Sequence, residues 1–166
     1  MLSAPTRRTI RLPSHDQLLP VCWNSRPGDF VSLMTLYESN YIGLLRLVPG
    51  LRSLTGAQVS VIDQDCPLTM RVLERGPYTT TFSLTYQFET GAGVIADPDL
   101  QVRAYHDAGM AEVLACARWH RHEVLAAIKS ALFVQLGDRW LRNVMLNKWI
   151  DYCLTRGHQH TWRARD

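Results

Sequence analysis

The sequence predicts an α+β fold, in which an N-terminal helix, an antiparallel meander sheet of about five strands and one or two C-terminal helices form two layers. Two observations indicate this fold. Apolar residues recur with helical spacing at 30–48 and again at 138–156, whereas between 57 and 118 they alternate with polar residues. Because each element then has one apolar face, packing the helices on one side of the sheet buries all of these faces together.

The first helix is expected between residues 29 and 48. Asp29 can cap its N-terminus, because a carboxylate accepts from N–H groups that have no partner in the first turn. Pro49 and Gly50 end the helix. Its apolar stripe consists of Phe30, Leu33, Met34, Tyr37, Tyr41, Leu44, Leu45 and Val48.

The alternating segments predict strands at 57–63 and 68–75, then a long strand that begins at Tyr78. A loop is expected at 90–99, followed by a hairpin of strands 100–106 and 110–118 that turns at Asp107–Gly109. In the long strand, Tyr78, Thr80, Phe82, Leu84, Tyr86 and Phe88 form one face and uniformly polar residues form the other.

Two helical segments follow. Residues 121–136 predict one helix and residues 138–156 a second, with Asp138 as its N-cap and Gly157 just after its end. The single domain is therefore expected to comprise residues 29–160, with a C-terminal tail at 161–166.

Residues 1–28 are predicted to form a flexible basic tail. They contain four of the eight prolines, the four arginines at positions 7, 8, 11 and 26, and one acidic residue, Asp16. The whole formal net charge of +3 therefore belongs to this tail. A weak nucleic-acid interaction through it is one hypothesis, but the neutral remainder and the lack of an aromatic RNA-binding signature argue against it.

Composition excludes several classes. The chain has 166 residues, 46% hydrophobic and 20% charged, and no window has the roughly 18 unbroken apolar residues of a membrane-spanning helix. The four cysteines, at positions 22, 66, 116 and 153, form no CxxC pair, which argues against a structural zinc site. Scattered thiols without a signal peptide favour a cytoplasmic protein with no membrane association.

Neither a cofactor nor a metal is expected. Residues 91–96 match the pattern G-x-G-x-x-A, but Pro98 prevents the helix that a dinucleotide-binding loop requires. Two histidine pairs, His120 with His122 and His158 with His160, have i, i+2 spacing, and Glu123 could add a third ligand only in irregular backbone. Occasional metal capture by exposed imidazoles is the favoured interpretation.

Four segments resemble the YqiB-like family of proteobacterial proteins, a domain of unknown function. They are YESNYIGLLRLVP at 37–49, YTT at 78–80, VRAYHDAGMAEV at 102–113 and WIDYCLTRGH at 149–158. The resemblance covers residues 37–158. It implies a small bacterial cytoplasmic protein without an established activity, and it supplies no catalytic residues.

The third of these segments contains the candidate binding residues. With Ala108 and Gly109 as the loop, Tyr105 faces Glu112 and His106 faces Ala111. Arg103, Tyr105, Asp107 and Glu112 then share one face of the sheet, and Leu100, Val102, Ala104 and His106 share the other.

The leading hypothesis is a non-catalytic binding or adaptor protein. Arg103, restrained by Glu112 and with Tyr105 beside it, could present its guanidinium to a protein partner or a small anionic ligand. The alternative interpretation of the same residues is a cross-strand ion pair on a solvated face.

A small-molecule enzyme, such as a hydrolase, is the second hypothesis. His106 could act as a general base with Asp107 or Glu112, because imidazole titrates near neutral pH. Consecutive strand residues point to opposite faces, however, so Asp107 orients His106 only if the turn bends it round. A hydrogen-bonded core or turn histidine is the favoured interpretation.

Overall fold

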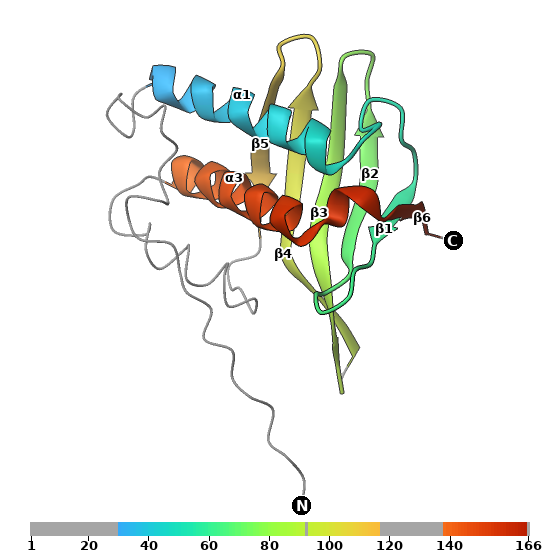
Figure 1. Ribbon diagram of the computed structural model, residues 1–166. Helices are drawn as coiled ribbons and strands as arrows, with labels where there is room; N and C mark the ends of the chain where they lie inside the picture. The colour runs from blue at the N-terminus through green and yellow to red at the C-terminus, as the bar shows by residue number, and fades with distance from the viewer. Residues whose placement is uncertain (1–29, 92, 117–137, 166) are drawn as a thin grey trace, which may run out of the picture.

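Residues 30–91, 93–116 and 138–165 are described by the computed structural model shown in Figure 1. The predicted tail at 1–28, the Asp29 cap, the helix at 121–136 and the first histidine pair lie outside these residues. In chain order the elements are α1 (Phe30–Leu47), β1 (Ala57–Ser60), β2 (Leu68–Arg75), β3 (Thr79–Thr90), β4 (Gly93–Tyr105), β5 (Met110–Ala115), α3 (Asp138–Arg156), the short 3₁₀ helix η2 (His158–His160) and β6 (Trp162–Ala164).

The strands form one antiparallel sheet in the order β5-β4-β3-β2-β1-β6. α1 and α3 lie side by side across one face of it (Figure 1). No described helix lies over the other face. The predicted α+β fold in two layers is confirmed, with six strands in the described residues instead of about five.

The core lies between the helices and the inward face of the sheet. Phe82, Leu84 and Tyr86 of β3 are completely buried, as the alternation predicts. Trp149 of α3 packs edge-on against Tyr86, with ring centroids 5.2 Å apart. The helices predicted at 29–48 and 138–156 are confirmed: α1 ends at Leu47, and Gly157 follows α3 with a φ of +96°, a value that glycine adopts without strain.

The predicted loop at 90–99 is wrong, because β4 begins at Gly93 and pairs with β3 as far as Thr90. Pro98 lies at a bulge where the register shifts between the pairs Leu84–Leu100 and Tyr86–Asp97. A proline at a bulge removes no ladder hydrogen bond, so the strand continues through it.

The predicted C-terminal tail at 161–166 is also wrong, because Trp162–Ala164 form β6 at the edge of the sheet. A three-residue strand is too short to show alternation in sequence. It is held by pairing with β1 and by the Trp162 indole, whose Nε1 donates to the Leu47 carbonyl at the end of α1 (2.6 Å).

Buried asparagines join the two helices to the sheet. Asn40 of α1 donates to the backbone carbonyl of Asn143 (3.2 Å), and Asn147 donates to the side-chain oxygen of Asn40 (3.1 Å). The Asn143 side chain accepts the backbone N–H of Val113 in β5 at 3.0 Å. These bonds provide partners for polar groups that would otherwise be costly to bury.

Candidate functional site

The β4–β5 hairpin places the candidate binding residues on the outward face of the sheet. Arg103 pairs with Glu112 and Tyr105 with Met110, across a turn formed by residues 106–109. The predicted pairing of Tyr105 with Glu112 is therefore wrong by two residues, because the turn is longer than the two-residue loop assumed. A shift of two residues keeps every side chain on its face, so Arg103, Tyr105 and Glu112 still lie together.

Arg103 is held by neighbouring strands. Its Nε donates to the Thr81 hydroxyl (2.9 Å), and its Nη2 forms an ion pair with Glu74 (3.2 Å). Thr81 lies directly opposite Arg103, and Glu74 lies opposite Thr81, so the three residues form a row across β4, β3 and β2. The predicted restraint by Glu112 is thus replaced by restraint from Thr81 and Glu74.

Glu112 is instead bound by two tyrosines. The Tyr105 hydroxyl donates to its Oε1 (2.7 Å), and the hydroxyl of Tyr37 in α1 donates to its Oε2 (3.4 Å). Burial and the adjacent Glu112 carboxylate raise the pKa of both tyrosines. Both phenols therefore stay protonated as donors at neutral pH, and the outward carboxylate is fixed in position.

His106 lies on the helix-facing side of the sheet, away from Arg103. Its Nδ1 is 3.1 Å from the Tyr41 hydroxyl and its Nε2 is 2.8 Å from the Thr80 hydroxyl. Burial and the charges of Arg52 and Arg75 lower the pKa of His106, although Asp107 acts in the opposite sense. The parity prediction that Arg103 and His106 lie on opposite sides is confirmed.

This environment does not assemble a catalytic base. Within the described part of the chain, both ring nitrogens of His106 lie against hydroxyl groups, and neither Asp107 nor Glu112 hydrogen-bonds to them. Asp107 is exposed in the turn, and Thr80 is completely buried. The favoured sequence interpretation, a hydrogen-bonded turn histidine, describes the geometry.

A second polar cluster is buried at the C-terminal end of α3. The sequence does not predict the contacts within it. The Ser60 hydroxyl lies 2.8 Å from His158 Nδ1, and Asp65 lies 3.5 Å from His158 Nε2. Tyr86 donates to Asp65 (3.2 Å) and contacts Cys153 (3.4 Å). The alternation that places Tyr86 on the inward face is the sequence feature that could have indicated this cluster. Sequence spacing does not relate His158 to residues about a hundred positions away.

A serine, a histidine and an aspartate in this order suggest a hydrolase, but access argues against one. Ser60 and His158 are completely buried, and the Asp65 side chain is 4% exposed. Burial raises the pKa of the Cys153 thiol to about 12, so this thiol is not a nucleophile at neutral pH. The cluster therefore joins β1, β3 and the end of α3 structurally.

Metal-ligating side chains do not gather in the described ranges, where no group of three or more His, Cys, Asp or Glu could hold an ion. His158 is enclosed by the cluster above, whereas His160 is exposed. No described helix is both long enough and apolar enough to span a membrane.

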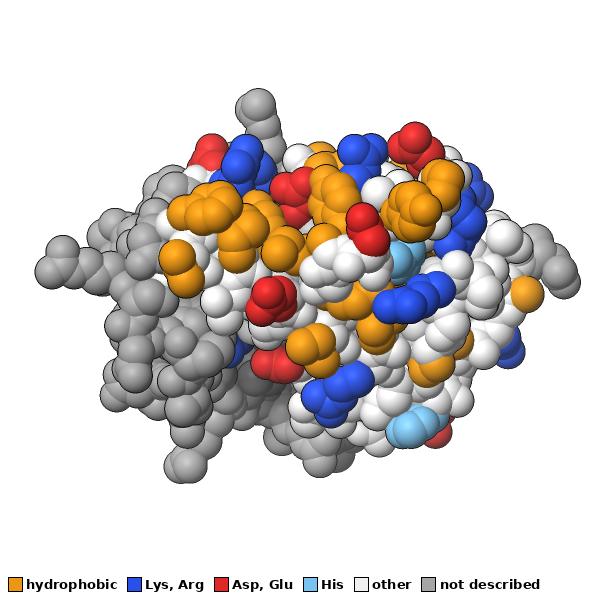
Figure 2. All heavy atoms as spheres, turned by 90° about the horizontal axis from the view of Figure 1, so that it is seen from above, with side chains coloured by type: hydrophobic (Ala, Val, Ile, Leu, Met, Phe, Trp, Pro, Cys, Tyr) orange, Lys and Arg blue, Asp and Glu red, His pale blue; other side chains and the backbone are white. Residues whose placement is uncertain are grey.

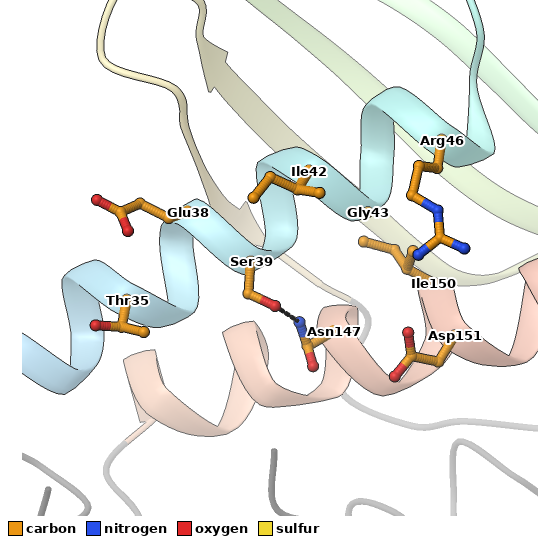
Figure 3. Close-up of a pocket in the computed structure, with 9 residues that line it drawn as sticks. All are labelled: Thr35, Glu38, Ser39, Ile42, Gly43, Arg46, Asn147, Ile150 and Asp151. Atoms are coloured by element: carbon orange, nitrogen blue, oxygen red, sulfur yellow. Dashed lines mark hydrogen bonds between the residues drawn. The ribbon is translucent and has the colours of Figure 1, made fainter. Parts of the chain in front are cut away.

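A groove of about 270 Å³ lies between α1 and α3 (Figure 3). Gly43 allows Ile150 to approach α1 closely, and Asn147 donates to the Ser39 hydroxyl (2.9 Å). Arg46 and Asp151 extend toward each other across it (Figure 3). The groove follows from close helix packing, and its small size and opposing charges make it a weaker candidate than the open sheet face.

The end of the molecule where β4 turns into β5 presents a mixed surface. Figure 2, which views this end, shows hydrophobic, basic and acidic side chains adjacent to one another. Tyr78, which is 65% exposed, lies at this end, because its carbonyl accepts from the His106 N–H of the turn (2.8 Å). Leu73, which is 48% exposed, precedes Glu74 in β2. Such a mixture is typical of protein-binding surfaces, in which tyrosine and arginine are enriched.

Comparisons with known proteins agree with the sequence resemblance. A family model described as "Protein of unknown function (DUF1249)" matches residues 43–159. The uncharacterized protein YqiB of Escherichia coli strain K12 is 29% identical over 129 residues, which cover 78% of this chain and 91% of YqiB. YqiB of E. coli O6:H1 and of E. coli O157:H7 gives the same values. No solved structure gives a significant match.

Proposed function

This chain belongs to the DUF1249 family of proteins of unknown function, and we propose that it is a cytoplasmic, non-catalytic binding protein that recognises a partner protein with the outward face of its β4–β5 hairpin. One observation carries the proposal. Arg103, Tyr105 and Glu112 are held in fixed positions by hydrogen bonds on a sheet face that no described element covers.

Fixed side chains favour binding, because little conformational entropy is lost when a partner docks. Arg103 is anchored through Nε and Nη2, and its side chain remains 35% exposed. Tyr105 is half-buried, and its hydroxyl is bound to Glu112. Exposed Leu73 and Tyr78 nearby supply apolar area that a partner can cover.

Catalysis is less well supported than binding. A general base needs a ring nitrogen that can reach a substrate, and both nitrogens of His106 lie within hydrogen-bond distance of Tyr41 or Thr80. The lowered pKa keeps the imidazole neutral, which suits a structural hydrogen bond as well as it suits a base.

The test is affinity purification of the tagged chain from its own cells, with quantitative mass spectrometry. We expect a partner that is recovered with the wild type and with Arg46→Ala, an exposed arginine of α1, but is depleted with Arg103→Ala. The partner is then purified, and its affinity for Tyr105→Ala is measured directly. Identical protein lists for Arg103→Ala and the wild type would contradict the proposal.

A further inference from the structure

A second hollow lies on the outward face of the sheet, toward the edge formed by β1 and β6. It has a volume of about 650 Å³ and is lined by side chains of β1 to β4 and by the residue that follows β6. The lining residues are Ala57, Thr69, Arg71, Leu73, Ser83, Thr85, Gln87, Asp99, Gln101 and Arg165. Leu73 touches the surface proposed above for a partner protein; the other nine residues lie outside it.

Hydroxyl and amide groups dominate the floor of this groove. Thr69, Ser83 and Thr85 lie on adjacent strands, since Thr69 pairs directly with Thr85. Thr69 is 7% exposed, and its hydroxyl oxygen is buried without a hydrogen-bond partner among the described residues. An unpaired buried hydroxyl is costly, so a bound group that supplies its partner gains that free energy.

Two arginines stand at one end of the groove, on either side of the small Ala57. Arg71 pairs with Ala57 from β2, and the backbone N–H of Arg165 donates to the Ala57 carbonyl from the other side (3.0 Å). Arg165 is held by Gln87 at 2.7 Å. The exposed Arg71 makes no hydrogen bond or ion pair within the part of the chain described, so its donors are available to a ligand.

Asp99 supplies the opposite charge. It lies in the bulge of β4 with a φ of +48°, and its backbone N–H donates to the Thr85 hydroxyl (3.2 Å). The groove therefore offers guanidinium groups for an anion at one end, and it also contains a carboxylate that can accept hydrogen bonds from the hydroxyl groups of a ligand.

From these features we infer that the groove binds a small polyhydroxylated molecule that carries a phosphate or carboxylate group. The arginines would bind the anionic group, and the row of hydroxyls, amides and Asp99 would exchange hydrogen bonds with the ligand hydroxyls. Among the described residues, the lining contains no aromatic side chain on which nucleobases could stack, and its apolar side chains are those of Leu73 and Ala57. This composition favours a polar small molecule over a nucleic-acid strand or a protein.

The inference is independent of the proposed partner protein, because the groove and the Arg103 row use different charged residues. The Thr69 oxygen is not exposed to solvent, so a ligand reaches it only after neighbouring side chains move. Arg71, two residues along β2 on the same face, is exposed and can move without disturbing the core.

The experiment is an NMR titration of the full-length, ¹⁵N-labelled chain with four probes: glucose 6-phosphate, glucuronate, glucose and inorganic phosphate. We expect saturable shifts for glucose 6-phosphate or glucuronate, confined to amides of β1 to β4 and β6, and these two probes distinguish the phosphate from the carboxylate. Glucose and inorganic phosphate should each bind more weakly than the better charged sugar, since each offers only one half of the ligand.

Three variants decide the site. Arg71→Gln should weaken the better probe about tenfold, whereas Arg46→Gln on the helix layer should leave its affinity unchanged. Thr69→Val should weaken binding without lowering the free energy of unfolding, because it removes a hydroxyl that has no partner in the free protein. The inference is overturned if neither charged sugar saturates, if the shifts map elsewhere, if Arg71→Gln binds as tightly as the wild type, or if inorganic phosphate alone binds as tightly as the better sugar.

Discussion

His106 and Asp65 show how the enclosed polar residues use their hydrogen-bonding capacity. Each ring nitrogen of His106 lies within hydrogen-bond distance of a hydroxyl group. The Asp65 carboxylate accepts hydrogen bonds from Tyr86 and from Arg156 (3.2 Å each). Alternation along β4 could predict the face on which His106 lies. It could not predict Tyr41 or Thr80 as partners, because those contacts depend on how α1 and β3 are placed in three dimensions.

His106 makes the stability of the protein depend on pH near neutrality. Its folded pKa lies below the ordinary value of 6.5 because of burial and the charges of Arg52 and Arg75. Unfolded chains therefore bind a proton before folded chains do, and the free energy of unfolding falls as the pH drops from about 6.5 through the lower folded pKa. His106→Gln should lose less stability than the wild type between about pH 7.5 and pH 5.5 in urea denaturation.

The same comparison provides the control, since the remaining histidines contribute equally to both proteins. An identical loss of stability in His106→Gln and the wild type would show that this imidazole is not the responsible group.

Asp65 should contribute to stability at neutral pH and lose that contribution in acid. Burial raises its pKa, but hydrogen bonds from His158 and from the Cys66 N–H, together with the nearby charges, outweigh burial and lower the pKa below the ordinary 3.8. The contribution is complete above about pH 4 and is lost as the pH falls through the lower folded pKa. Asp65→Asn should lower the free energy of unfolding at pH 7 by about 3 kcal/mol.

Asp63, an exposed residue of the same turn, gives a matched substitution. Asp63→Asn should change the free energy of unfolding by less than about 0.5 kcal/mol when both variants are measured by urea denaturation. Equal effects of the two substitutions would show that the buried cluster does not depend on the Asp65 carboxylate.

Helices and strands were predicted well where the apolar pattern is long. They were predicted poorly where pairing with a neighbouring strand, rather than the segment's own sequence, determines the conformation. α1, β2 and α3 follow the expected ranges closely, because α1 and α3 each bury a long apolar stripe and β2 buries Leu68 and Met70. β6 and the first part of β4 escaped prediction, because their conformation is fixed by β1 and β3 rather than by their own residues. The register of the β4–β5 hairpin, which determines the neighbours of Arg103, likewise depends on the turn length.

The contact between α1 and α3 depends on Gly43. A Cβ atom at this position would lie 2.9 Å from Cγ2 of Ile150, and the β-branched Ile150 side chain has little freedom to rotate away within a helix. An alanine normally favours a helix by about 1 kcal/mol relative to glycine. Here we expect Gly43→Ala to destabilise the protein by about 1–2 kcal/mol, because overpacking outweighs the helix preference.

Urea denaturation of Gly43→Ala and Ile42→Ala tests this expectation. Ile42 is 59% exposed on the same helix, so its truncation should have little effect. A Gly43→Ala protein more stable than the wild type would mean that the helices separate without cost.

At the scale of the whole molecule, the sheet separates two roles. The inward face, with the helices, holds the core, whereas the outward face presents the charged and hydroxyl-bearing residues to which we assign binding. The sequence could predict this division because alternation assigns each residue to a face. It could not predict the outward groove, because that hollow combines residues from β1 to β4 with Arg165, which lay in a predicted tail.

Neighbouring residues of β4 should therefore respond differently to truncation. Val102 is completely buried and Arg103 is partly exposed. Val102→Ala should lower the free energy of unfolding by about 2 kcal/mol. Arg103→Ala should lower it by less than about 1 kcal/mol, while it removes the binding that we propose. A larger loss for Arg103→Ala than for Val102→Ala in thermal or urea denaturation would contradict this separation.

The hydrogen bond from the Val113 N–H to Asn143 has a consequence for chains that meet one another. Among the described strands β5 lies at one edge of the sheet, and an edge strand with unpaired N–H groups is a template on which a strand of a second chain can add. Asn143 occupies this donor, and at the opposite edge β6 is short, contains Arg163 and is followed by Arg165. Without the Asn143 side chain, the Val113 N–H is therefore open to a strand of a second chain. We expect the first effect to be self-association through the sheet edges wherever newly made chains accumulate at high concentration.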